Sequence, residues 1–155
     1  MSVNDDHCLA IGRITVAFSE LDNWLSSFIW ALITTFEEQH LGQIITAELS
    51  FRQKLDLVAA LFKYRCKDTA KQAELKGLIA RVEKLEARRN TVQHSLWIHL
   101  SEKRDQLTQL KITAKRKNGL IHTKNIITPQ QLEQLSKELN DATSDLASFH
   151  ISFLL

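Results

Sequence analysis

Glycine and proline are scarce in this chain, whose 155 residues include only 4 Gly and 1 Pro. Because these two residues interrupt regular structure, their scarcity predicts long uninterrupted elements, chiefly helices. An excess of one charge is also lacking: 20 basic residues stand against 18 acidic ones, so bulk charge indicates no polyanionic partner. Hydrophobic residues make up 44% of the chain, enough to bury a core, and we expect one domain over residues 1–155.

Paired cysteines and long apolar runs are absent as well. Cys8 and Cys66 form no CxxC pair, which is typical of a reduced, intracellular protein. The N-terminal MSVNDDHC is acidic and lacks the apolar region of a signal peptide. The most apolar stretch, WLSSFIWALI at 24–33, is about half the roughly 20 residues that a membrane span needs. We therefore expect a cytoplasmic protein that does not bind a membrane.

Apolar residues recur every three or four positions from about residue 6 to residue 36, which predicts one long first helix. Trp24 and Trp30 add a second apolar stripe to it, wider than a single packing face requires. This width indicates that a second copy of the chain packs against the helix. The first break in the helical pattern is expected at residues 41–48.

The remaining elements are predicted from caps and turns. Ser50 is placed to cap a second helix, and a third helix follows a polar turn at 67–69. Asn118-Gly119 predicts the turn of a β-hairpin at about 107–128, because both residues can take positive φ. Thr128-Pro129-Gln130-Gln131 has the N-cap, first-turn proline and capping-box glutamine of a last helix. The predicted fold is mainly α: a bundle of about four helices with a β-hairpin inserted before the C-terminal helix.

Arg89 falls on the apolar side of the third helix, where the three- and four-residue steps of Leu75, Leu78, Val82 and Leu85 continue to Arg89, Val92 and Leu96. A half-buried guanidinium is costly unless a partner compensates it. One interpretation is a structural ion pair, with Glu20, Asp22 or Glu86 as the supporting carboxylate. The other is an arginine directed at a phosphate, because its planar fork binds two phosphate oxygens at once.

Asn90 and His94 lie four residues apart and therefore share one face of a helix. Arg89 and His94 are well separated in angle, so the three side chains converge only if the helix breaks or a second copy supplies half of the site. The stretch Arg89-Asn90-Thr91-Val92-Gln93-His94 resembles the RNxxxH form of the Rx4–6H motif of the HEPN family. The order of the predicted helices is similar to that family over most of the chain.

The resemblance implies a metal-independent endoribonuclease of a toxin–antitoxin or phage-defence type, in which a homodimer joins two motifs into one cleft. It gives the catalytic roles to three residues: His94 as acid and base, Arg89 on the phosphate charge, and Asn90 as the orienting group. RNA is then the substrate, an antitoxin protein is a further expected partner, and no cofactor is needed. The alternative is a non-catalytic HEPN-like dimeric module that binds RNA, a nucleotide or a partner protein.

Some toxins of the family carry a tyrosine two residues after the motif histidine, and the antitoxin modifies it. Here that position is Leu96, so the resemblance does not extend to this control. The six histidines show no HExxH or Cys/His spacing, and no metal site is predicted.

Basic charge is concentrated near the predicted hairpin, where residues 101–125 hold seven basic and two acidic residues, a net charge of +5. Candidate contacts to an RNA backbone are Lys111, Lys115, Arg116 and Lys117. The alternative is that these lysines protect the edge of a sheet from pairing with other chains.

Overall fold

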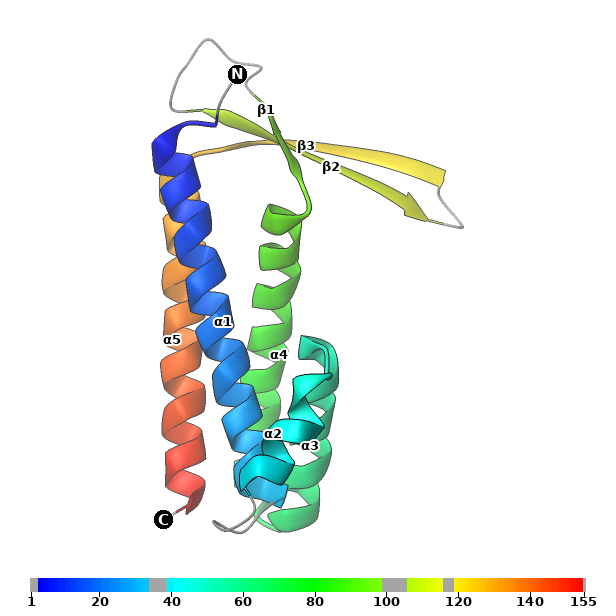
Figure 1. Ribbon diagram of the computed structural model, residues 1–155, viewed down its shortest axis with the longest axis vertical. Helices are drawn as coiled ribbons and strands as arrows, with labels where there is room; N and C mark the ends of the chain where they lie inside the picture. Colours follow the sequence, from blue (N-terminus) through cyan, green and yellow to red (C-terminus); the bar gives the residue numbers. More distant parts are fainter. Residues whose placement is uncertain (1–2, 34–38, 99–105, 116–118, 155) are drawn as a thin grey trace. The chain divides into compact units, whose positions relative to one another are not determined.

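The computed structural model of the chain describes residues 3–33, 39–98, 106–115 and 119–154. Its helices are α1 (Asp5–Ile33), α2 (Gln39–Ala47), α3 (Phe51–Arg65), α4 (Thr69–Gln93) and α5 (Pro129–Leu154) (Figure 1). Its strands are β1 (Leu96–Ile98), β2 (Leu107–Lys115) and β3 (Gly119–Ile127), joined as an antiparallel sheet in the order β1-β2-β3. The predicted class, mainly α with strands before the last helix, is confirmed.

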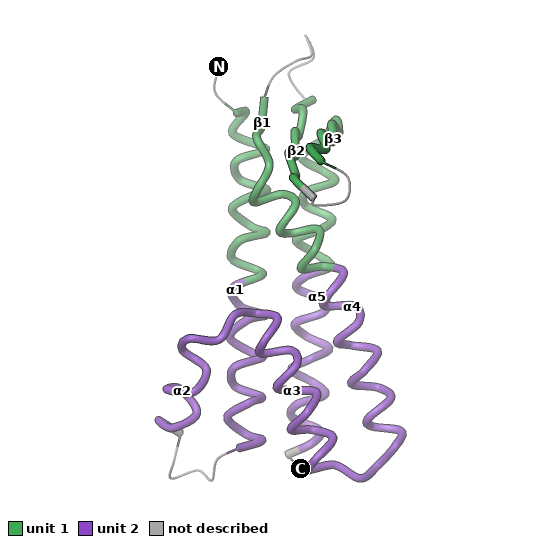
Figure 2. Tube along the Cα trace, turned by 90° about the vertical axis from the view of Figure 1, so that its right-hand side faces the viewer, with its two compact units in different colours: residues 1–18, 85–138 green, residues 19–84, 139–155 purple. Residues whose placement is uncertain are grey.

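The chain divides into two compact units, shown in different colours in Figure 2. Unit 1 contains residues 1–18 and 85–138, and unit 2 contains residues 19–84 and 139–155. α1, α4 and α5 each contribute to both units, so each unit combines segments that are far apart in the sequence. Unit 1 holds the Arg89–His94 motif together with the whole sheet. Across the described residues, no helix combines the length and the apolarity that crossing a bilayer requires.

The hairpin of unit 1 forms where the sequence predicts it. β2 and β3 pair in continuous register, from Leu107 opposite Ile127 to Lys115 opposite Gly119. Gly119 has φ +66, in the left-handed region that glycine enters without strain. Asn118, the other predicted turn residue, lies outside the described residues.

Both predicted helix caps are confirmed. At α5, the Thr128 N–H donates to Gln131 Oε1 at 2.9 Å and the Gln131 N–H donates to Thr128 Oγ1 at 3.4 Å. At α3, Ser50 and Gln53 exchange the same two hydrogen bonds. These reciprocal bonds satisfy amide groups that would otherwise lack a partner in the first turn of each helix.

The core of unit 2 is aromatic and aliphatic. Phe62 lies with its ring centre 5.3 Å from that of Phe149 and 5.0 Å from that of Phe153. Lys54 is only 7% exposed, and its Nζ donates to Asp22 Oδ2 at 2.7 Å. This pairing compensates a charge that burial would otherwise make costly. Many apolar residues that recur at three- and four-residue steps in the predicted helices are buried in this unit, namely Leu21, Leu25, Phe28, Leu55, Val58, Leu75, Leu139, Leu146 and Phe149.

The predicted break at residues 41–48 is wrong, because α2 occupies most of this stretch. α2 buries Gly42 and Thr46 but leaves Ile44 71% exposed, so its apolar residues do not mark its packed side. Trp30 Nε1 donates to Thr46 Oγ1 at 2.7 Å, and a Cβ on Gly42 would come within 2.6 Å of the Trp30 ring. The small residues of α2 therefore fit against Trp30. Since Trp30 belongs to the second apolar stripe of α1, part of that stripe packs within one chain and does not require a second copy.

The extension of the third predicted helix to Leu96 is also wrong. α4 ends at Gln93, Leu96 begins β1, and its side chain is 57% exposed. Leu96 pairs with Leu110 of β2, and Ile98 pairs with Thr108. The short strand β1 was not predicted, because three residues give too little alternation to recognise.

His150 is buried in unit 2, stacked on Phe28 with 4.8 Å between ring centres. Neither of its ring nitrogens makes a hydrogen bond with a described residue. Burial lowers the pKa of the His150 imidazole below its usual 6.5. As the pH falls below 6.5, the unfolded chain binds a proton that the folded chain binds only at lower pH. This residue therefore makes the fold acid-sensitive, with full stability above that pH and declining stability below it.

Replacing His150 by leucine, which has a similar volume, should remove this acid sensitivity. The melting temperature should rise at pH 7.5, because a buried unpaired polar group costs about 1–3 kcal/mol. Between about pH 7.5 and 5.5 the melting temperature of His150→Leu should fall less than that of the original chain. The exposed His40 provides the control, since His40→Leu should retain the full acid sensitivity. Equal pH profiles of all three proteins would contradict this account.

Candidate functional site

Arg89 lies half-buried near the C-terminal end of α4, as its place in the apolar series predicts. Its guanidinium carbon is 4.2 Å from the centre of the Phe18 ring, a cation–π distance. Its Nη1 donates to Asn90 Oδ1 at 3.0 Å. The ring and the amide therefore fix the position and the plane of the guanidinium within unit 1.

The three carboxylates predicted to support Arg89 have different surroundings. Glu20 is exposed, and Asp22 pairs with Lys54 inside unit 2. Glu86 is 9% exposed and belongs, like Arg89, to unit 1. It precedes Arg89 by three residues on α4, which places the two on neighbouring positions of the helix surface. The structural interpretation of Arg89 therefore centres on Glu86.

His94 lies in the turn that directly follows α4, and its side chain is exposed. Its backbone N–H donates to Asn90 O at 3.0 Å, and its imidazole makes no hydrogen bond with the described residues. Within one chain the structure thus joins Arg89 to Asn90 but does not bond His94 to either side chain. The helix does end at the motif, which is one of the two conditions under which the three side chains were expected to converge.

The end of α4 is held by polar side chains that the sequence analysis missed. Ser95 Oγ donates to Thr91 O at 2.5 Å, and Trp97 Nε1 donates to Val92 O at 3.1 Å. Gln109 Nε2 approaches Thr91 O at 3.5 Å from β2. The last carbonyls of a helix have no partner within the helix, so these donors replace the missing bonds. The Gln109 contact joins residues that are distant in the sequence, and no spacing pattern indicates it.

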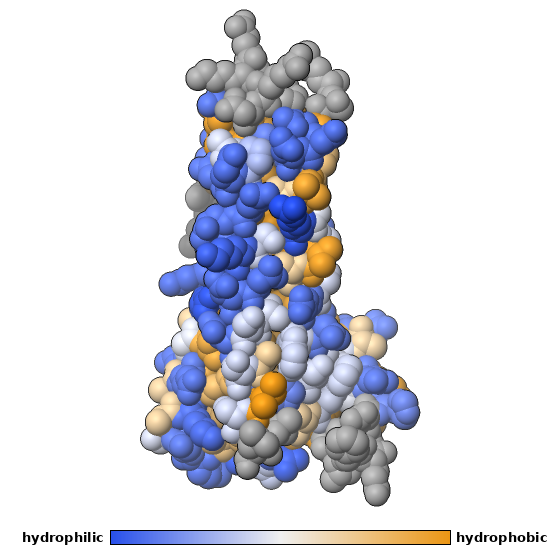
Figure 3. Space-filling view, turned by 90° about the vertical axis from the view of Figure 1, so that its left-hand side faces the viewer, coloured by the Kyte–Doolittle hydropathy of each residue, from blue (hydrophilic) through white to orange (hydrophobic). Residues whose placement is uncertain are grey.

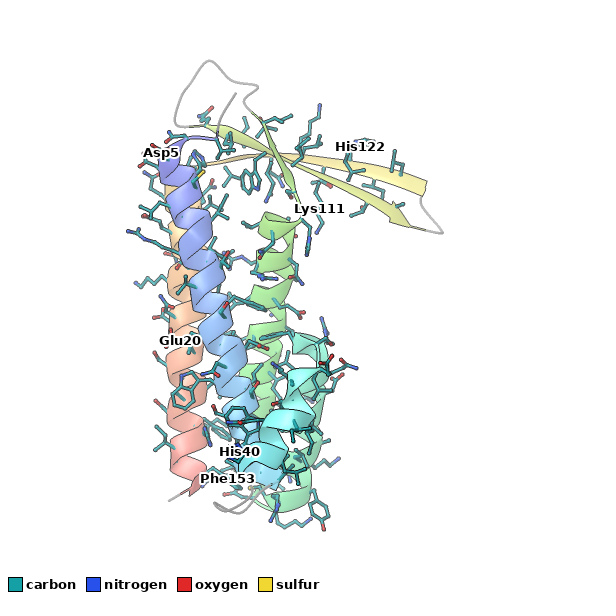
Figure 4. All side chains as sticks on the ribbon, in the orientation of Figure 1. Asp5, Glu20, His40, Lys111, His122 and Phe153 are labelled. Atoms are coloured by element: carbon teal, nitrogen blue, oxygen red, sulfur yellow. The ribbon has the colours of Figure 1, made fainter. Side chains whose placement is uncertain are left out.

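Lys111 comes from β2 to the same end of α4, where its Nζ donates to Thr91 Oγ1 at 2.8 Å. Figure 4 shows Lys111 and His122 extending to opposite sides of the hairpin. Lys115 is the last residue of β2, opposite Gly119, while Arg116 and Lys117 lie outside the described residues. Within the part of the chain that the structure describes, Lys111 is a predicted RNA contact whose side chain reaches the motif.

The other side of the sheet carries several exposed apolar residues. Strand register puts Ile112 beside His122, Ala114 beside Leu120 and Thr108 beside Ile126, and side chains alternate between the two sides. Large apolar residues exposed on this side are Leu96 at 57%, Ile112 at 52%, Leu120 at 64% and Ile126 at 58%. The sheet therefore places Gln109 and Lys111 on the α4 side, and on the other side exposed apolar residues alternate with His122 and Lys124.

Among the residues that the structure describes, no group of three or more His, Cys, Asp and Glu side chains is arranged to hold a metal ion. Comparison of the chain with protein-family models, with curated proteins and with solved structures finds no match. The resemblance to HEPN proteins therefore depends on the motif and on the order of the elements.

Lys111 gives a direct test of the predicted RNA contact. Lys111→Met keeps most of the aliphatic stem but removes the charge, so it should weaken binding of an unstructured single-stranded RNA. The slope of log K against log salt should fall by about 0.7 for one lost phosphate contact. Lys124→Met removes the same charge from the other side of the hairpin and should leave the slope unchanged. Equal effects of the two substitutions would show that only the total charge of the hairpin matters.

Proposed function

We propose that the chain is a metal-independent endoribonuclease of the HEPN type, of the toxin–antitoxin or phage-defence kind, and that it cuts RNA as a homodimer. The observation that supports this proposal is the grouping of chemistry at the end of α4. A fixed guanidinium (Arg89), an amide (Asn90), an ammonium (Lys111) and an exposed imidazole (His94) all belong to unit 1. These are the group types that cleavage of an RNA phosphodiester uses.

In the proposed reaction the 2′-hydroxyl of the RNA attacks the neighbouring phosphorus. The 2′-oxygen–phosphorus bond forms, the bond from phosphorus to the 5′-oxygen breaks, and the products are a 2′,3′-cyclic phosphate and a 5′-hydroxyl. One proton must leave the 2′-hydroxyl and another must reach the departing 5′-oxygen. Histidine suits both transfers because its unperturbed pKa of roughly 6.5 lies near neutrality. Arg89 offsets the charge that develops on the phosphorane oxygens.

The two proton transfers also favour a dimer. A single neutral imidazole can accept one proton. If the other proton is donated in the same step, a second histidine in its protonated imidazolium form is needed. Two copies of His94 meeting about a two-fold axis provide one of each. The same arrangement compensates for the absence of a hydrogen bond from His94 to Arg89 or Asn90 within the described part of one chain.

The non-catalytic alternative keeps one observation in its favour. Arg89 packs on Phe18 and bonds to its neighbour Asn90, contacts that also suit an arginine with a structural role. In that case the chain would be a dimeric module that binds RNA, a nucleotide or a partner protein without cutting. Substitution of His94 separates the two functions, because only the nuclease needs its imidazole.

The surface that joins two copies is proposed to include the outer side of α1 in unit 1. Leu9 and Val16 are 55% and 69% exposed, and their seven-residue separation places them on one side of the helix. Trp24 and Trp30, which first indicated a dimer, have partners inside unit 2: the His150 ring and Thr46. On the face drawn in Figure 3, apolar residues form small separate groups among hydrophilic ones. A dimer contact therefore requires more than one such group.

Light scattering at micromolar concentration should give about twice the 17.8 kDa mass of the chain. Val16→Asp should convert the dimer to a monomer, because it places a charge in a dry contact. Ile151→Asp introduces the same charge at an exposed apolar residue of unit 2 and should leave the dimer intact. A monomeric mass for the unsubstituted protein would remove the composite site.

His94→Ala should reduce RNA cleavage by about 10²–10⁴-fold, the usual contribution of general acid–base catalysis. The circular dichroism spectrum and the dimer mass should stay unchanged, since the side chain is exposed. His122→Ala, which removes an exposed histidine on the outer side of the sheet, should cut normally. Cleavage should survive EDTA and leave 2′,3′-cyclic phosphate ends. Undiminished cutting by His94→Ala, or cutting that depends on a divalent metal, would exclude the proposed mechanism.

A further inference from the structure

A cavity of about 400 Å³ lies within unit 1, beside the last turns of α4. Its apolar wall comes from three elements and consists of Val92, Ile127, Leu132 and Leu135. Thr91, inside the RNxxxH motif, and Gln109 of β2 also line it. The volume falls within the roughly 300–1,000 Å³ of small-molecule sites, which are also mainly apolar with a few placed polar groups.

Gln109 is the unusual residue of this cavity. Its side chain is only 4% exposed, yet the single hydrogen bond recorded for its amide is the 3.5 Å approach of Nε2 to Thr91 O. Its Oε1 accepts no hydrogen bond from the described residues. Because Gln109 lines the cavity and its Oε1 is not among the side-chain atoms that burial leaves without a partner, this oxygen still reaches solvent and is available to a ligand that donates a hydrogen bond.

Charge beside the cavity favours an anionic ligand. Arg88 lines the cavity, but its guanidinium pairs with Glu138 and so has a carboxylate at hand. Lys111 Nζ reaches Thr91 Oγ1 at 2.8 Å, which brings an ammonium to a lining residue. An ammonium in this place retains two further N–H donors, because a lysine carries three.

We propose that the cavity binds the base of a nucleotide. The flat ring fills the space between Leu132, Leu135 and Ile127, and an amino or ring N–H group on its edge donates to Gln109 Oε1. The phosphate extends along Thr91 to Lys111. A free nucleoside monophosphate and a nucleotide within an RNA strand share this chemistry. The second source rests on the proposed nuclease function, where the cavity would hold the base of one nucleotide of the bound strand.

Two substitutions test the cavity without altering the residues assigned to catalysis. Gln109→Leu keeps the volume but removes the acceptor, and Ala87→Phe fills the cavity from an exposed lining position. Adenosine 5′-monophosphate and a single-stranded RNA of mixed sequence serve as the two probes, with dissociation constants measured by isothermal titration calorimetry. Matched controls are Asn125→Leu, the exposed partner of Gln109 in the β2–β3 register, and Ala80→Phe, an exposed position of α4 in unit 2.

Gln109→Leu should weaken binding of the probe about tenfold or more, because the ligand donor then meets an apolar wall. Ala87→Phe should abolish binding of the mononucleotide, while both controls bind as the unsubstituted protein does. Binding of the mononucleotide identifies a free nucleotide as the source, and binding of the RNA alone identifies the strand. The proposal would be overturned if either probe bound with a dissociation constant that neither cavity substitution changes. It would also be overturned if neither probe bound at millimolar concentration.

The proposed nuclease function and the proposed nucleotide cavity can be disproved separately. If Ala87→Phe cuts RNA with unchanged KM and kcat and the mononucleotide does not bind, the cavity proposal is overturned and the nuclease stands. If no RNA is cut but the mononucleotide binds in a way that Ala87→Phe prevents, the cavity stands and the nuclease does not.

Discussion

The end of α4 at Gln93 depends on a set of hydrogen bonds centred on Thr91, and the rest of unit 1 is arranged around them. The Thr91 hydroxyl donates to Ala87 O and accepts from Lys111 Nζ, while its carbonyl accepts from Ser95 Oγ. A helix terminus that meets other elements needs donors for its last carbonyls. Ser95, Trp97 and Gln109 supply them from the chain that follows. This requirement decides where the helix stops and which strand residues face it.

The same requirement explains the unusual polarity of the sheet. A strand that packs on a helix usually turns its apolar residues inward. Here Gln109 and Lys111 face α4 because its terminal carbonyl and hydroxyl need donors, so the alternation sends Leu110 and Ile112 to the other side. Leu107 and Ile127, farther along the hairpin, follow the ordinary rule and face inward with Gln109. The apolar residues on the outer side are thus a consequence of satisfying the helix end.

Sequence patterns predicted those parts of the fold that depend on neighbouring residues. The cap at Ser50, the capping box at Thr128 and the glycine at the hairpin involve residues within three positions of one another, and all are found. α2 and β1 were missed because each depends on a partner elsewhere in the chain: Trp30 for Gly42 and Thr46, and β2 for Leu96. Leu41, Ile44 and Ile45 of α2 are spaced like one side of a helix, but all three are exposed, so this spacing does not indicate the side that packs.

The residues of the candidate site also differ in whether the sequence alone indicates them. Arg89 was placed on the apolar side of its helix by spacing alone, and the Phe18 contact agrees with that placement. Glu20 and Asp22 were proposed as partners of Arg89 from their charge alone. Charge does not specify which cation lies beside a carboxylate, and in the structure Asp22 pairs with Lys54. Thr91 and Gln109 could not be found by either argument. Their importance follows from hydrogen bonds that only the folded chain creates.

The electrostatics of the helix end restrict how a phosphate can bind there. The C-terminus of a helix carries roughly half a negative charge, which repels an anion. Bonds from Ser95 and Trp97 to the last carbonyls offset part of that charge, and the guanidinium of Arg89 and the ammonium of Lys111 add positive charge from two sides. Arg89 and Thr91 are two residues apart, about 200° around the helix, so Arg89 and the Lys111 that bonds to Thr91 lie on different sides of α4. Lys111, which no motif includes, is therefore the cation to test on the Thr91 side of α4, and Arg89 is the cation to test on the Phe18 side.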